Sequence, residues 1–216
     1  MSPSPAPIAV SALLLCGGKS RRFGQEKGLT LFAGEPLAAR VLSALDAIST
    51  DVWVSANRPD MYAQLGRPIV KDLHPDGGPL AGLHAALLSI RHDLLAVAAC
   101  DMPFVSVTLF EHMLTLARER DDWDVIVPTQ SHASDRAPAE RLRYQTLHAI
   151  YHRRCLTPIA ALLDRGERMI LRLYDQVRVR EVPEEEWRAL PGVDARVFEN
   201  INTPEDARRL EVPPED

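Results

Sequence analysis

Cysteine is scarce in this sequence, and its placement indicates neither a bridge nor a metal site. The 216 residues include three cysteines, Cys16, Cys100 and Cys155, which lie far apart along the chain. Such an odd and scattered set provides no disulfide framework and no zinc-ligand spacing. This cysteine usage fits a reducing compartment, so we expect a cytoplasmic protein.

Long apolar runs and a secretory leader are missing as well. The apolar run at 8–16 is too short to span a bilayer, and the opening MSPSPAPIAV lacks the basic residues with which a leader begins. We therefore expect no membrane association. We also expect residues 1–7 to be a disordered tail.

A strong excess of charge is also absent. The chain has 25 basic and 30 acidic residues, a net charge of −5, which argues against general binding to nucleic acid. With 46% hydrophobic residues it can bury a substantial core. There is no internal repeat, low-complexity tract or clear linker, so we predict a single domain over residues 1–216.

The remaining pattern alternates short apolar runs with amphipathic stretches. In the first half it predicts strands at 8–16, 51–57, 68–72, 93–100 and 124–128, and helices at 36–48, 79–90 and 107–120. This rhythm is typical of parallel strands joined by right-handed crossovers, and so of an α/β fold with a mostly parallel sheet. In the second half, residues 129–143 are polar and turn-rich; strands are expected at 144–151 and 176–182, and helices at 155–168 and 203–210.

A cationic, glycine-bearing loop follows the first predicted strand. Besides Gly17 and Gly18, it contains four cations, Lys19, Arg21, Arg22 and Lys27. Open parallel sheets bind ligands beyond the carboxyl ends of their strands, and N–H groups beside glycines can form an anion-binding hollow. The loop is therefore a candidate phosphate site. The alternative is a solvated turn whose cations face water.

The fingerprints of several other protein classes are absent. The loop matches neither the P-loop G-x-x-x-x-G-K-[ST] nor the dinucleotide fingerprint G-x-G-x-x-G. No G-x-S-x-G indicates a serine hydrolase. His148 and His152 are four residues apart, but they lack the H-E-x-x-H pattern and a third ligand, so we interpret them as structural or as lying near a substrate.

Polar residues follow other predicted strands. Asp101 comes directly after the strand at 93–100, where a carboxylate can hold Mg²⁺ together with phosphate oxygens and water. A helix cap is the alternative role. Asp72 either forms a turn or contacts a ligand, and Asn57 either caps a turn or reads the edge of a base with its amide.

The cationic loop also resembles a known signature. LCGGKSRRFGQEKG is similar to the pattern L-A-[AG]-G-x-S-x-R-[MF]-G-x-x-K of nucleotidyltransferases, and its double glycine most resembles the molybdenum cofactor guanylyltransferases, which attach GMP to molybdopterin. The resemblance continues through SANRP, KDLHPDGGPLAGL, ACDMPF, LHAIYHRRC and NINTPED, nearly the whole chain. Three residues depart from the family: Cys16 replaces the usual Ala, Phe23 a common Met, and Glu26 the Asp that often precedes the lysine.

The resemblance implies a fold, a reaction and a set of roles. The fold would be a three-layer, Rossmann-like nucleotidyltransferase domain with a mostly parallel, twisted sheet. The enzyme would transfer GMP from GTP to Mo-molybdopterin and release pyrophosphate. Asp101 would hold Mg²⁺, while Lys27 and Arg22 would stabilise the phosphates. The contacts to GTP would come from Leu15, Cys16, Gly17, Gly18, Lys27, Asn57, Asp72 and Asp101.

The acceptor side is assigned to the motif NINTPED. Thr203 and Pro204 are good opening residues for a helix, which leaves Asn200 and Asn202 unexplained. If residues 197–201 are extended, both amides lie on one face. The resemblance places this segment beside the active site, so we expect both amides to position molybdopterin. Proteins that deliver molybdopterin or mature molybdoenzymes would be partners.

Two other functions remain open. The first is a CTP-dependent cytidylyltransferase, or another small-molecule nucleotidyltransferase, of the same fold. The second is a nucleotide-binding regulator without catalysis, which would be expected to lack either the metal acid or the lysine. Asp101 and Lys27 are both present in this sequence.

Overall fold

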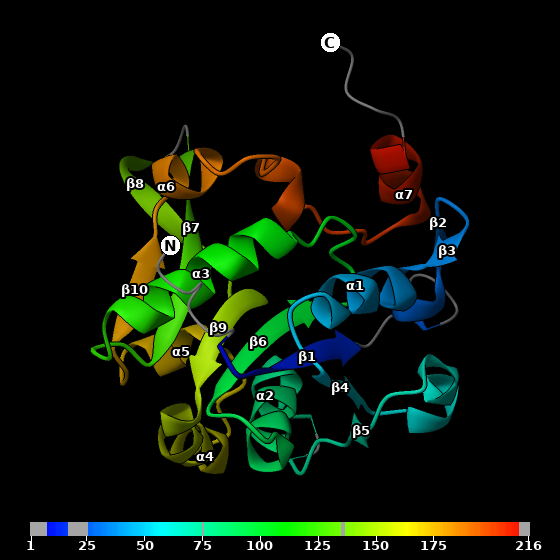
Figure 1. The fold of residues 1–216 in the computed structure, drawn as a ribbon, viewed down its shortest axis with the longest axis horizontal. Helices are drawn as coiled ribbons and strands as arrows, with labels where there is room; N and C mark the ends of the chain where they lie inside the picture. The colour runs from blue at the N-terminus through cyan, green and yellow to red at the C-terminus, as the bar shows by residue number, and fades with distance from the viewer. Residues whose placement is uncertain (1–7, 17–25, 75, 135–136, 212–216) are drawn as a thin grey trace, which may run out of the picture.

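Residues 8–16, 26–74, 76–134 and 137–211 are described by a computed structural model (Figure 1). Within these residues one eight-stranded sheet has the order β10-β7-β9-β6-β1-β4-β5, with β8 paired to β7. Its strands are β1 (Val10–Cys16), β4 (Asp51–Ala56), β5 (Ile69–Val70), β6 (Leu94–Ala99), β7 (Val125–Ser134), β8 (Ala137–Tyr144), β9 (His148–His152) and β10 (Val179–Val182). The short strands β2 (Leu31–Phe32) and β3 (Glu35–Pro36) pair separately.

Helices cover both faces of this sheet (Figure 1). The main ones are α1 (Leu37–Asp46), α2 (Gly78–Ser89), α3 (Val107–Glu119) and α4 (Leu156–Asp164). Shorter helices are α5 (Leu171–Tyr174), α6 (Glu184–Arg188) and α7 (Pro204–Glu211). The three layers confirm the predicted α/β architecture. No helix among the described residues is both long and apolar enough to cross a membrane.

The four neighbouring strands β6, β1, β4 and β5 are parallel. β1 pairs in parallel with β4 and β6, β4 pairs in parallel with β5, and β10 pairs in parallel with β7. β9 runs antiparallel to both β6 and β7, so those two strands share one direction. The carboxyl ends of β1, β4, β5 and β6 therefore meet at one edge of the sheet, where such folds bind ligands.

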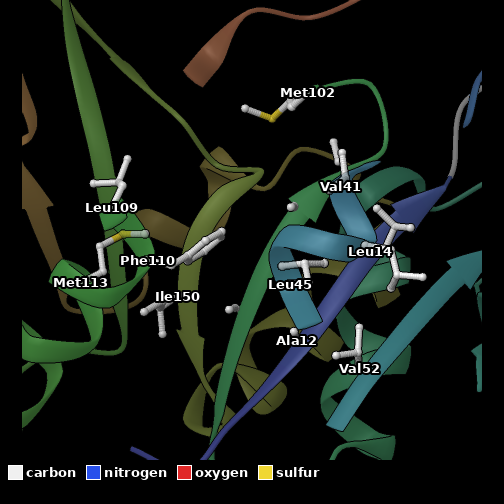
Figure 2. Close-up of a cluster of buried hydrophobic side chains, with 14 of the residues drawn as sticks. Ala12, Leu14, Val41, Leu45, Val52, Met102, Leu109, Phe110, Met113 and Ile150 are labelled. Carbon is white, nitrogen blue, oxygen red and sulfur yellow. The ribbon is translucent and has the colours of Figure 1, made fainter. Parts of the chain in front are cut away.

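Alternation along β1 divides the core into two clusters. Leu14 and Cys16 pack on the face covered by α1 and α3, whereas Leu13 and Leu15 pack on the face covered by α2 and α4. Figure 2 shows the first cluster, in which Leu14 and Ala12 lie with residues of α1, while residues of α3 pack near β9. Burial on both faces explains why β1 is apolar at nearly every position.

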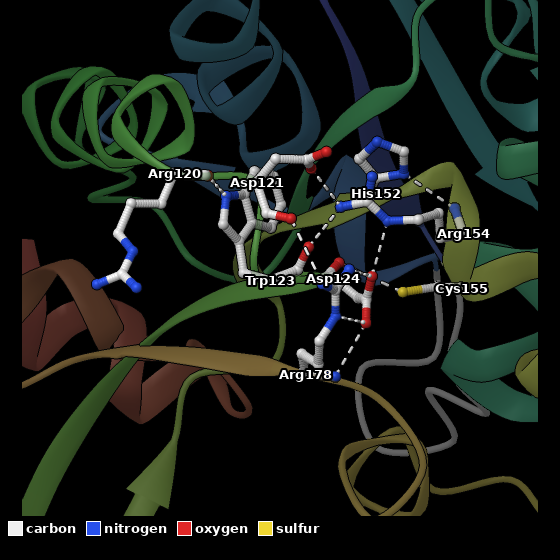
Figure 3. Close-up of polar contacts among 8 residues, drawn as sticks. All are labelled: Arg120, Asp121, Trp123, Asp124, His152, Arg154, Cys155 and Arg178. Carbon is white, nitrogen blue, oxygen red and sulfur yellow. Dashed lines mark hydrogen bonds and ion pairs between the residues drawn. The ribbon is translucent and has the colours of Figure 1, made fainter.

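The amino end of β7 is tied to its neighbours by one carboxylate (Figure 3). Asp124 accepts hydrogen bonds from Arg178 Nε at 3.0 Å and Nη2 at 2.8 Å, and from Arg154 Nε at 2.8 Å. The backbone N–H of Arg178 donates to the same carboxylate at 3.0 Å. These bonds, those from Arg178 above all, hold the pKa of Asp124 far below its ordinary value. They join the starts of β7 and β10 to the end of β9.

One prediction about local structure is wrong. Residues 129–143 are not a turn-rich stretch but largely belong to an antiparallel pair, in which Thr129 of β7 lies opposite Tyr144 of β8. Two strands that satisfy each other's backbone groups need no apolar periodicity, so a polar sequence can form such a ribbon. The edge strand β10 and the last helix α7 form where they were predicted.

Candidate active site

Three segments distant in sequence meet at the carboxyl edge of the sheet. Lys27 begins the 3₁₀ turn η1 (Lys27–Leu29), Asp101 follows β6, and Asn202 precedes α7. Lys27 Nζ lies 2.5 Å from Asp101 Oδ2 and donates to Asn202 Oδ1 at 2.7 Å. The N–H of Ile201 donates to the carbonyl of Asp101 at 2.9 Å. This bond holds the segment after β6 against the segment before α7.

The backbone at Asn202 is held by a cap on α7. Asp206 Oδ2 accepts hydrogen bonds from the N–H groups of Asn202 at 2.9 Å and Thr203 at 2.8 Å. In return, Thr203 Oγ1 accepts from the N–H of Asp206 at 3.1 Å. These bonds, led by the one from Asn202, lower the pKa of Asp206. The reciprocal pattern is a capping box, so NINTPED combines a helix start with a side chain in the site.

A second carboxylate lies at the same edge, beside β4. Asp72 follows β5 and is half-buried; Ser55 Oγ donates to its Oδ1 at 3.4 Å. Burial raises the pKa of Asp72, and hydrogen bonds from Ser55 and Asn57 act in the opposite direction. Asn57 is exposed. The structure therefore brings Asp72 and Asn57 together, and their contact with a nucleotide stays a prediction.

Sequence reasoning missed two residues that shape this second region. A Cβ on Gly82 would lie 2.7 Å from Leu15 Cδ2 and 2.7 Å from Ser55 Oγ. Only glycine lets α2 approach the ends of β1 and β4 so closely. Gly82 ends the motif GGPLAG and Ser55 opens the motif SANRP, so both lie in motifs that carry the family resemblance, but neither residue was given a role.

The end of β1 supplies a buried wall. Leu15 is 7% exposed and Cys16 is 4% exposed. Burial raises the pKa of the Cys16 thiol, which lies beside the thiol of Cys100, the residue directly after the neighbouring strand β6. The Cys16 thiol is therefore protonated at neutral pH and acts as a small apolar group. This explains how Cys16 can stand where the family has Ala.

Several predicted site residues remain to be placed. Gly17, Gly18 and Arg22 lie outside the described residues. The condition that residues 197–201 be extended is met only in part, because Val197 and Phe198 belong to the 3₁₀ turn η5 (Ala195–Phe198) and Glu199 after it is extended. Asn200 Nδ2 donates to the carbonyl of Phe198 at 3.3 Å, so the two amides of the motif have different partners.

The two histidines of β9 contact described residues other than Lys27, Asp101 and Asn202. His148 is fully buried, with its ring stacked on Phe110 at 4.5 Å and edge-on to Phe198 at 5.6 Å. Burial lowers its pKa to about 3, so the ring is neutral. His152 Nδ1 accepts a hydrogen bond from the N–H of Arg154. Both contacts favour the structural interpretation of these residues.

The side chains at the site could hold a hard cation such as Mg²⁺ only with help from a bound ligand. Across the described ranges, no group of three or more His, Cys, Asp and Glu side chains is arranged to hold a metal. Asp101 offers a single carboxylate, 23% exposed, whose Oδ1 makes no hydrogen bond to any described residue. Mg²⁺ is commonly held by one or two carboxylates with phosphate oxygens and water, so this site suits it only alongside a bound phosphate.

Comparison with known proteins identifies the family. The sequence pattern described as the MobA-like NTP transferase domain matches residues 12–179. The chain belongs to this family. Its members are nucleotidyltransferases, which agrees with a site that combines a lysine and a carboxylate at the carboxyl edge of a parallel sheet.

Several known proteins are similar to this chain over more than nine-tenths of its length. A probable molybdenum cofactor guanylyltransferase of Pelotomaculum thermopropionicum is 33% identical over 205 residues, 95% of this chain and 93% of that protein. A molybdenum cofactor guanylyltransferase of Burkholderia ambifaria is 36% identical, over 94% of this chain and 95% of that protein. The crystal structure of molybdopterin-guanine dinucleotide biosynthesis protein A from Archaeoglobus fulgidus has a TM-score of 0.74 and 27% identity, covering 93% of this chain and 96% of that one.

Proposed function

We propose that this MobA-like NTP transferase transfers GMP from GTP to Mo-molybdopterin and releases pyrophosphate. The observation that carries the proposal is the convergence of Lys27, Asp101 and Asn202 at the carboxyl edge of the sheet. The names of relatives similar over more than nine-tenths of the chain support the choice of donor and acceptor. The reaction would take place in the cytoplasm, with molybdopterin-delivering or molybdoenzyme-maturing proteins as partners.

The chemistry requires alignment and charge neutralisation rather than a general base. A terminal phosphate on molybdopterin is already anionic at neutral pH, so it can attack the α-phosphorus of GTP without losing a proton. The enzyme must hold two polyanions in line. Lys27 has three N–H donors, of which Asp101 and Asn202 engage two, so the third remains for a phosphate oxygen. Arg22 would add a second cation.

Asp101 would hold Mg²⁺ together with phosphate oxygens. When bound, the cation would neutralise negative charge on the triphosphate. Asn202, which accepts a hydrogen bond from Lys27, would help to position molybdopterin together with Asn200.

The base would lie against Asp72 and Asn57, with Leu15, Cys16, Gly17 and Gly18 approaching the nucleotide along the end of β1. Guanine presents adjacent N–H donors on its pairing edge, which one carboxylate can accept together. Cytosine presents a single exocyclic donor there. The half-buried Asp72 therefore favours guanine.

A thermal-shift panel of GTP, CTP, ATP and UTP with Mg²⁺ tests the donor. A nucleotide at a hundredfold excess over its Kd adds about 2.7 kcal/mol of stability, so we expect the largest shift with GTP. A larger shift with CTP would favour a cytidylyltransferase. Binding of GTP without pyrophosphate release in the presence of Mo-molybdopterin would favour a nucleotide-binding regulator.

A further inference from the structure

Glu26, the residue before Lys27, is held by the side chains of Arg58 and Tyr62, which we call its support. Glu26 Oε1 accepts a hydrogen bond from Arg58 Nη1 at 3.0 Å, and Glu26 Oε2 accepts one from the hydroxyl of Tyr62 at 3.3 Å. The Glu26 side chain is 18% exposed. Its backbone carbonyl also accepts the first hydrogen bond of the η1 turn, from the N–H of Leu29 at 3.0 Å. Glu26 is therefore held by both its side chain and its main chain.

Tyr62 can reach Glu26 because a glycine follows the lysine. Tyr62 is 1% exposed, and a Cβ on Gly28 would lie 3.0 Å from both its Cε1 and its hydroxyl oxygen. Any larger residue at 28 would displace the ring. Burial raises the pKa of the Tyr62 phenol, so the hydroxyl keeps its proton and donates.

The support connects two parts of the site. Arg58 directly follows Asn57, and Tyr62 directly follows the 3₁₀ turn η2 (Pro59–Met61) on the same segment after β4. Glu26 directly precedes Lys27, which contacts Asp101 and Asn202. A link between residues 57–62 and Glu26 is thus a link between the base side and the lysine. A carboxylate one methylene shorter could not span the same two donors without movement of the backbone.

We propose that Glu26 is a positioning residue, which Tyr62 and Arg58 anchor so that Lys27 keeps its place against Asp101. The bonds fix the carbonyl from which η1 starts, and with it the backbone that carries the lysine. This proposal rests on the proposed function, because its test measures the rate of GMP transfer. Its geometry depends only on the contacts of Glu26.

Tyr62→Phe is the first test, because it removes one oxygen and keeps the ring. We expect kcat for GMP transfer to fall about tenfold while the Kd for GTP, measured by thermal shift, changes less than about twofold. Tyr174→Phe is the matched control: Tyr174 is a partly buried tyrosine whose hydroxyl contacts the hydroxyl of Tyr151 at 3.1 Å, outside the site. Both variants should lower the unfolding midpoint, but only Tyr62→Phe should lower kcat.

A double-mutant cycle completes the test. Glu26→Gln keeps an acceptor for Tyr62 and should retain most of kcat, whereas Glu26→Ala should lose about as much as Tyr62→Phe, roughly tenfold. The double variant should be no slower than either single one. Additive losses, or an unchanged kcat in Tyr62→Phe, would overturn the positioning role. If Tyr62→Phe is unfolded at the assay temperature, Glu26→Gln against Glu26→Ala carries the same comparison.

The two proposals fail in different ways. A wild-type protein that neither binds GTP nor transfers GMP contradicts the proposed function. A wild-type protein that does both, with variants indistinguishable from it in kcat, contradicts the role of Glu26 alone.

Discussion

The two edges of the central sheet hold their aspartates differently. At the amino edge, Asp51 accepts hydrogen bonds from Ser11 Oγ at 2.6 Å, the N–H of Arg91 at 3.0 Å and Trp53 Nε1 at 3.1 Å. Burial opposes ionisation there, yet these bonds lower the pKa of Asp51, as those of Arg178 and Arg154 do for Asp124. At the carboxyl edge, burial raises the pKa of Asp72.

The difference separates stability from function. A carboxylate saturated with donors stabilises the folded chain but has no free lone pair in a good position for a ligand. Asp72 and Asp101 have fewer donors, so they can accept more from a nucleotide or a cation. Changes at the amino edge should therefore alter unfolding, and changes at the carboxyl edge should alter turnover.

Asp101→Asn should give the largest effect. The change keeps the size of the side chain and removes the charge that faces Lys27, so we expect Mg²⁺-dependent GMP transfer to fall about 10³-fold. Circular dichroism should show an unchanged fold. Steady-state rates across a Mg²⁺ titration provide the measurement, and an unchanged dependence on the metal would assign Mg²⁺ to another carboxylate.

Asp124→Asn makes the same chemical change at the opposite edge. We expect a loss of about 2 kcal/mol of unfolding free energy, or about 5 °C in Tm, with kcat unchanged. The two arginines are partly exposed, which keeps the loss moderate. Thermal unfolding measures it. A fall in kcat without a fall in Tm would break the division between the edges.

The same variant should change the response to acid. Because the folded pKa of Asp124 lies below the ordinary value of 3.8, its ionised form stabilises the fold above that pH. This stability is lost as the pH falls through the folded pKa. Wild type should therefore lose more stability below about pH 4 than Asp124→Asn does. Equal acid sensitivity would mean that Asp124 contributes no such stability.

The sequence revealed the carboxyl edge far better than the amino edge. Strand periodicity located Asp72 and Asp101 at strand ends, and the resemblance indicated Asn202. Asp124 drew no attention, because an aspartate before a strand has no distinctive neighbours until folding brings Arg154 and Arg178 to it. The ribbon of β7 and β8 was missed for a related reason, since its stability comes from pairing rather than from an apolar face.

The two asparagines of NINTPED provide a finer test within the carboxyl edge. Replacement of both by Ala should weaken use of the acceptor and leave GTP binding nearly intact. Since Asn202 contacts Lys27 and Asn200 contacts its own turn, Asn202→Ala should account for most of the loss, about tenfold in kcat/KM for molybdopterin. Equal loss of the thermal shift with GTP in the double variant would make the pair structural.

Asp72→Asn should have the smallest effect on stability, and one of opposite sign to Asp124→Asn. The folded pKa of Asp72 lies above its ordinary value of 3.8, so the folded state binds the proton more readily than the unfolded chain does. Stability from this group is therefore highest at low pH and falls as the pH rises through the folded pKa. At pH 7 the variant should be about 0.5 kcal/mol more stable than wild type, an advantage that disappears below about pH 4.

The same substitution should weaken the thermal shift with GTP, because an amide cannot accept two adjacent N–H donors as a carboxylate does. Urea unfolding at pH 4 and pH 7, with and without GTP, measures both effects on one protein. Gly82 and Ser55 leave little room for relaxation around the new side chain. The difference in stability between Asp72→Asn and wild type therefore measures the effect of the charge. If Asp72→Asn is instead less stable than wild type at pH 7, the carboxylate is as well satisfied as Asp124, and the contrast between the two edges fails at this residue.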